Sequence, residues 1–187
     1  NVSNINVSSA APVPNMVIVA ADSDGLISVD TNIARVDLVF DVVGVYTGSV
    51  TEFVPPAPPF RSTAPTRILD TRNGTGVRQG PLLDGREIVF DVDDLAQVPD
   101  DAEAVMMNVT VTGPTTPGYL SVWPGGVPRP LVSSLNFLAS QTVANLVLVP
   151  IGIDGTVRLY TRAASVHVVA DLAGYYSWSG GTPWPGR

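Results

Sequence analysis

The chain carries a long internal duplication. Residues 3–47 align without a gap with residues 133–177, and 15 of the 45 aligned pairs are identical, where unrelated sequences share roughly 3 at ordinary residue frequencies. The identical pairs are of two kinds: Asn, Asp and Gly residues that suit strand ends, and alternating valines that suit inward positions of a strand. The duplicated feature is therefore backbone geometry and core rather than reactive chemistry.

The rest of the chain has the same all-β pattern. Short runs rich in Val, Ile, Thr and Tyr are separated by Gly, Pro, Asp and Asn, and the one helical candidate is a turn at residues 93–96. Strands are expected at residues 13–20, 26–30, 36–46, 87–92, 104–112, 118–123, 142–149, 156–161 and 166–176. Their number and spacing favour a β-sandwich of the jelly-roll type. A weaker match of residues 107–123 to residues 144–160 keeps a β-trefoil-like fold as the alternative.

The proline-rich stretch FVPPAPPF, residues 53–60, predicts a domain boundary, because proline cannot join a central ladder. Residues 1–52 are then a partial module equivalent to a second half, residues 61–178 are a complete module, and residues 179–187 are a linker or tail. A half-module exposes strand edges and an apolar face. We therefore expect residues 1–52 either to dock onto their neighbour or to complete another molecule.

Composition excludes several classes of function. The net charge is -7 and the ten basic residues are all scattered arginines, so nucleic acid and anionic membranes are poor partners. No apolar run approaches the roughly 20 residues of a membrane helix, so no membrane insertion is expected. There is no Cys or Lys, only one His, and no Gly-x-Ser-x-Gly, so thiol, Schiff-base and triad chemistry have no candidates. We expect no enzyme activity and no cofactor.

From Pro65 the chain reads PTRILDTRNGTG, and later AVMMNVTVTGPTTPGYLSVWPGG, SSLNF, QTVANLVLVPIGIDGTVRLY and VVADLAGYYS. Over about residues 64–177 this resembles the "LDTR" β-modules of secreted multi-domain proteins from high-GC Gram-positive bacteria. Residues 3–47 resemble the second half of a preceding module. The resemblance implies an accessory role outside the cell or at its surface, next to other modules, and implies no catalytic residues.

Arg67, Asp70 and Arg72 form the most distinctive polar cluster. On a strand Asp70 and Arg72 share a face, and a carboxylate between guanidinium groups suits bidentate bonding. The favoured interpretation is a salt bridge that holds the module's first strand. Binding of an anion or a sugar is the alternative.

Asp22 and Asp24 of DSDG offer oxygen ligands at the close spacing that calcium requires. The duplicate reads GIDG and keeps only the Asp-Gly step, which is what a hairpin turn needs. A turn is therefore favoured, and the calcium site is a weak candidate. The acidic residues between 91 and 101 are interpreted as a solvated loop.

Tyr119, Trp123 and Tyr160 are the candidate ligand-binding residues. Alternation in GYLSVWP places Leu120 inward and the two aromatic residues of this run outward. Together with Tyr160 they would form a flat platform that stacks on sugar rings. The competing interpretation is that a loop, or the unit at residues 1–52, covers them.

Two functions follow from these patterns. The first is a non-catalytic structural module of an extracellular or surface protein that docks through strand edges onto copies of itself or adjacent modules, in the extreme as a subunit of a fibre or lattice. The second is an accessory module that binds carbohydrate or cell wall through the aromatic platform.

Overall fold

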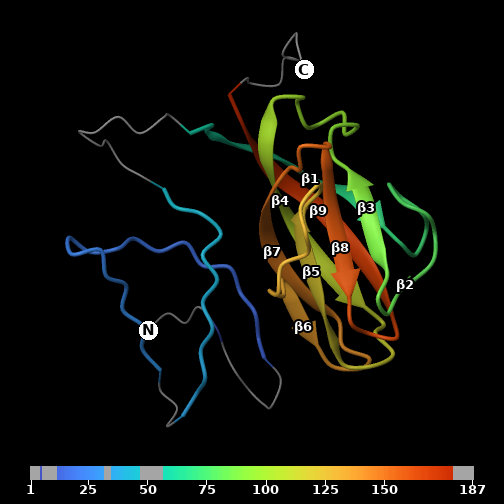
Figure 1. Cartoon of the computed structure of the whole chain (residues 1–187), viewed down its shortest axis with the longest axis horizontal. Coiled ribbons are helices and arrows are strands. Elements are labelled where there is room, and N and C mark those ends of the chain that lie inside the picture. Colours follow the sequence, from blue (N-terminus) through green and yellow to red (C-terminus); the bar gives the residue numbers. More distant parts are fainter. Residues whose placement is uncertain (1–4, 6–11, 32–34, 47–56, 179–187) are drawn as a thin grey trace.

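The computed structural model describes residues 5, 12–31, 35–46 and 57–178 of the 187-residue chain. Nine strands, all between residues 60 and 177, form two antiparallel sheets that pack face to face (Figure 1). The expected β-sandwich is confirmed, and the trefoil-like alternative is wrong because the strands form two open sheets. Within the described ranges there is no helix.

Each sheet has four strands in its main path. The first has the order β1 (Phe60–Asp70), β9 (Ser165–Ser177), β4 (Ala102–Thr112) and β7 (Val143–Pro150). The two-residue β2 (Leu82–Leu83) also pairs with β9. The second has the order β3 (Glu87–Asp91), β8 (Thr156–Thr161), β5 (Gly118–Pro124) and β6 (Leu135–Phe137). Alternate side chains of both sheets fill one core, as a two-sided sandwich requires.

The strand pairing is that of a jelly roll: β1 lies against β9, β3 against β8, β4 against β7, and β5 against β6. We call β1–β5, residues 60–124, the outgoing arm, and β6–β9, residues 135–177, the returning arm. The three remaining pairs, β2–β9, β4–β9 and β5–β8, also join one arm to the other. No two strands of the same arm are neighbours, so neither arm forms a sheet of this kind alone.

The six strands expected within the module agree with the structure to within two residues at each end. The strands β1, β2 and β6 have no such counterpart. Residues 60–70 contain Pro65 at an irregularity of the β1–β9 register, which removes the simple alternation that identifies a strand. The strands β2 and β6 are too short to carry a period.

The helical turn expected at residues 93–96 is wrong. The Asp91 carboxylate accepts the amide hydrogens of Asp93 at 3.1 Å and Asp94 at 3.3 Å. The chain then makes two tight turns, from Leu95 N to Val92 O and from Val98 N to Leu95 O. These local bonds satisfy the backbone without a helix.

The N-terminal copy of the returning arm does not form the strands expected at residues 13–20, 26–30 and 36–46. Among residues 12–31 and 35–46 the only defined feature is a turn at 23–25, and Figure 1 shows this segment, in blue and cyan, as a trace without arrows beside the sandwich. The physical reason is the arm topology: the partners of a returning arm all belong to an outgoing arm. The one outgoing arm in the described chain is already paired with residues 135–177.

Described residues of the segment contact the sandwich at both of its ends. Met16 N donates to Asn145 Oδ1 of β7 at 3.3 Å. The hydroxyl groups of Tyr46 and Tyr176 are hydrogen-bonded, with ring centroids 6.5 Å apart. Burial, followed by the bond to Tyr46, raises the pKa of Tyr176 to about 12. Met16 and Tyr46 of the segment thus each form a hydrogen bond with the sandwich of the same chain.

The first strand of the sandwich begins at the end of the proline-rich stretch. β1 begins at Phe60, the last residue of the proline-rich stretch, and residues 57–59 have no regular structure. Residues 47–56, which include the start of that stretch, and residues 179–187, the expected tail, lie outside the described residues.

Gly174 of β9 and its duplicate Gly44 provide a test of this arrangement. A Cβ atom at Gly174 would collide with the Arg61 carbonyl oxygen and the Phe60 ring, whereas nothing lies within 4 Å of one at Gly44. Gly174→Ala is expected to lower the free energy of unfolding by about 1–3 kcal/mol, because β1 must shift. Gly44→Ala should change it by less than about 0.5 kcal/mol in the same urea titration. Equal losses at the two glycines would contradict the asymmetry of the copies.

Candidate functional site

Asp70, the last residue of β1, is the centre of the polar cluster. Its side chain is almost completely buried, and its two oxygens accept four hydrogen bonds. Oδ1 accepts from Arg72 Nε and Arg72 N, each at 2.9 Å, and Oδ2 accepts from Arg72 Nη2 at 2.7 Å and Arg67 Nη1 at 3.1 Å. The strand ends at Asp70, so Arg72 lies in the following turn and not on a shared strand face as expected.

Arg67 extends the cluster to the other arm. It is the register partner of Asp171 on β9, and its Nε and Nη2 donate to the two oxygens of that carboxylate at 2.6 and 3.2 Å. This bidentate pair is the strong form of an ion pair. Arg67 therefore ties the first strand of the outgoing arm to the last strand of the returning arm.

The charges of the cluster are mutually compensated. Hydrogen bonding to Arg72, more than that to Arg67, holds the pKa of Asp70 well below its usual range despite burial. The bond to Asp171 raises the pKa of Arg67, and the bond to Asp70 raises that of Arg72. Since the buried carboxylate already has four donors, the geometry supports a structural role for Arg67, Asp70 and Arg72.

The aromatic platform is not open. Trp123 and Tyr160 are 3% and 7% exposed, so the expectation that these rings face solvent is wrong. The β5–β6 loop covers them: Trp123 Nε1 donates to Val127 O at 3.2 Å, and the Arg129 guanidinium lies 3.5 Å from the centre of the Tyr160 ring. Tyr119 is half-buried, with its ring centroid 6.3 Å from that of Tyr160. A cation over the ring takes the place a sugar would have.

The DSDG segment forms a tight turn, in which Gly25 N donates to Asp22 O at 3.1 Å, although no strands flank it within the described residues 12–31. Asp22 Oδ1 accepts the amide hydrogens of Asp24 and Leu26 at 2.9 and 2.8 Å. Gly25 has φ +78°, close to φ +75° at its duplicate Gly155. The weak calcium candidates Asp22 and Asp24 thus lie in a turn whose carboxylate serves the backbone. Over the described ranges, no group of three or more His, Cys, Asp or Glu side chains is placed to hold a metal ion.

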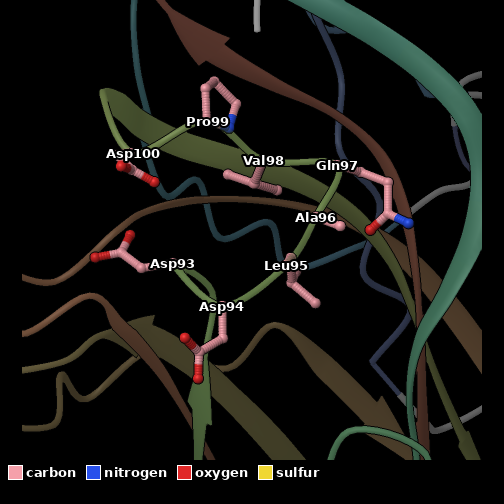
Figure 2. Close-up of a pocket in the computed structure, with 8 residues that line it drawn as sticks. All are labelled: Asp93, Asp94, Leu95, Ala96, Gln97, Val98, Pro99 and Asp100. Carbon is pink, nitrogen blue, oxygen red and sulfur yellow. The ribbon is translucent and has the colours of Figure 1, made fainter. Parts of the chain in front are cut away.

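The acidic loop after β3 borders a cavity of about 230 Å³ that residues 93–100 line. Figure 2 shows that Asp93, Asp94 and Asp100 do not point to a common centre; the Asp94 side chain is directed away from the other two. A larger hollow of about 540 Å³ lies beside β2 and β3, lined by Thr71, residues 76–83 and residues 86–89.

His167 has a structural place. Its Nδ1 lies 3.0 Å from Thr71 Oγ1, and that oxygen accepts the Val168 amide hydrogen at 2.9 Å. The pair links β9 to the turn that follows Asp70. The duplicated copy has Asp37 at the position of His167, so this contact is not shared by the two copies.

The strongest candidate for a functional surface is the segment of residues 12–46. Several of its apolar side chains are exposed where their duplicates are buried: Val42 is 84% exposed and Leu172 is 0%. The large apolar side chains exposed here are Val13, Val17, Ile18, Val19, Leu26, Ile27, Val29, Leu38, Val39, Phe40, Val42, Val43, Val45 and Tyr46. A monomer rarely exposes so much contiguous apolar sequence without a partner.

Two findings concern the chain as a whole rather than a single site. In the described part of the chain, no helix is long and apolar enough to cross a membrane. No protein-family model matches the chain, and no curated protein matches it either.

Proposed function

We propose that the chain is a non-catalytic structural module that docks through β-strand pairing: the sandwich is the folded carrier, and residues 12–46 are the docking segment. The observation that carries the proposal is the arm topology, in which every strand pair joins an outgoing to a returning arm. Residues 12–46 have the sequence of a returning arm, and their described parts, residues 12–31 and 35–46, have none of its strand pairs. Main-chain hydrogen bonds and an apolar face are the two requirements of β-strand addition.

The surroundings of this segment support a role in assembly rather than chemistry. Arg67 of the polar cluster joins β1 to Asp171 of β9, and Arg72 bonds to Asp70. The aromatic rings are covered by the β5–β6 loop. The resemblance to "LDTR" modules supports a place in an extracellular or cell-surface protein beside other modules. In this proposal the docking segment joins the carrier to a neighbouring polypeptide.

The proposal is tested on the purified 187-residue chain, with a shortened chain of residues 57–187 as control. Light scattering after size exclusion measures the oligomeric state of both chains, and the shortened chain is expected to be a monomer. Limited proteolysis is expected to cleave within residues 12–46 first and to leave the sandwich intact, because unpaired backbone is accessible to proteases. A stable monomer in which residues 12–46 resist cleavage would refute the proposal.

A further inference from the structure

We infer that the occupant of the docking segment is an outgoing arm of the same jelly-roll class, but one distinct in core shape from residues 60–124 of this chain. The inference rests on the proposed function and names its partner. The chain supplies its own template: residues 135–177 show, position by position, what a returning arm contacts when it is paired.

Asp41 and Gly44 of the segment correspond to two residues of β9 that contact the first strand of the outgoing arm. Asp171 binds Arg67 of β1, and the duplicate position holds Asp41, which has no ion pair among the described residues. Gly174 makes room for Phe60 and the β1 backbone, and the duplicate position holds Gly44, over which nothing lies. The segment thus has a carboxylate for an arginine and a gap for an aromatic ring, and both are unused in the contacts that the structure shows.

The core positions of the segment do not match the chain's own outgoing arm. Ala170 is fully buried and lies in register between Leu69 of β1 and Val109 of β4, and its duplicate is Phe40. Tyr175 is a buried core residue, and its duplicate is Val45. A phenylalanine in place of a buried alanine overpacks a close-packed core, and a valine in place of a tyrosine leaves it underfilled. The occupant must be smaller opposite Phe40 and larger opposite Val45.

The number of arms also argues against a second copy of this chain as the occupant. The described residues hold one outgoing arm, β1–β5, and the sequence holds two copies of a returning arm, residues 3–47 and 133–177. Exchange of arms between identical chains conserves these numbers, so one returning arm per chain stays unpaired however the chains are arranged. A second outgoing arm, which the described residues do not supply, is required to pair all of them.

The test adds an outgoing arm to the full chain. A second copy of residues 57–130 is fused in front of Asn1, which restores the natural spacing because residue 1 is equivalent to residue 131. Two forms are compared, one with the natural segment and one in which Phe40→Ala and Val45→Tyr adapt it to this arm. Amide hydrogen exchange is measured over residues 12–46, and over residues 135–177 as an internal control of folding.

The adapted fusion is expected to slow amide exchange over residues 12–46 by at least roughly a hundredfold relative to the unfused chain. The fusion with the natural segment is expected to slow it by about one tenth of that factor. In a matched control, Leu69→Asp and Val109→Asp within the added arm alone should abolish the protection, because both residues flank the position of Ala170. Residues 135–177 should stay protected throughout.

Three outcomes overturn the inference. Fast exchange over residues 12–46 in both fusions would show that an outgoing arm is not the occupant. Equal protection in both would show that this chain's own arm fits. Protection in the unfused chain that rises with concentration would identify a second copy instead. The proposed function fails separately, when the segment of the unfused chain resists proteolysis as a monomer.

Discussion

Replacing Leu172 by Ala is expected to lower the free energy of unfolding by about 2–5 kcal/mol. Leu172 is completely buried on β9, between Thr66 of β1 and Met107 of β4. Its loss leaves a cavity in a core that both sheets share. The replacement Val42→Ala at the duplicated position should change the unfolding free energy by less than about 0.5 kcal/mol, because that side chain is exposed. Urea denaturation of the full chain, followed by circular dichroism, measures both.

A second pair removes the difference in residue size from this comparison. Val149 of β7 is buried, and its duplicate Val19 is exposed. Val149→Ala should destabilise the sandwich, while Val19→Ala should leave the transition midpoint unchanged. A loss at Val19 as large as that at Val149 would show that the docking segment already has a packed core in the isolated chain, contrary to the proposed function.

Asp70→Asn is expected to cost about 2–4 kcal/mol near neutral pH, since several hydrogen bonds to a buried carboxylate are weakened or lost. A larger loss is not expected, because both arginine side chains are partly exposed and solvent screens their interaction with Asp70. Asp94→Asn, at an exposed carboxylate in the loop after β3, is the control and should change stability by less than about 0.5 kcal/mol.

The effect of Asp70→Asn on the free energy of unfolding is also expected to depend on pH. The folded state holds the pKa of Asp70 well below its usual range, so this group stabilises the fold at pH values above its unfolded pKa of about 3.9. The stabilisation is lost as the pH falls below that value towards the folded pKa. The difference in unfolding free energy between the natural chain and Asp70→Asn should therefore be constant from about pH 7 to 5 and shrink towards pH 2. A constant difference over the whole range would contradict the assigned role of Asp70.

The candidate sites show where local sequence stops being sufficient. The Asp-Gly turn was predictable, because a short carboxylate bonds nearby amides and glycine accepts φ +78° wherever the segment lies. The burial of Trp123 was not, because alternation along β5 describes only two faces and cannot show that residues of the β5–β6 loop fold over one of them. The approach of Arg129 to Tyr160 is a contact between distant residues that no local pattern encodes.

The sequence by itself determined the class of the fold, the position of most strands in the module, and the fact that one arm is present twice. These properties depend on side-chain alternation and turn chemistry, which are local. Only the tertiary structure decided which copy becomes β-sheet. A strand is completed by hydrogen bonds to a partner elsewhere in the chain, as between Arg67 of β1 and Asp171 of β9, and one outgoing arm pairs with one returning arm. The same pattern is therefore a set of strands in residues 135–177 and an unpaired segment in residues 12–46.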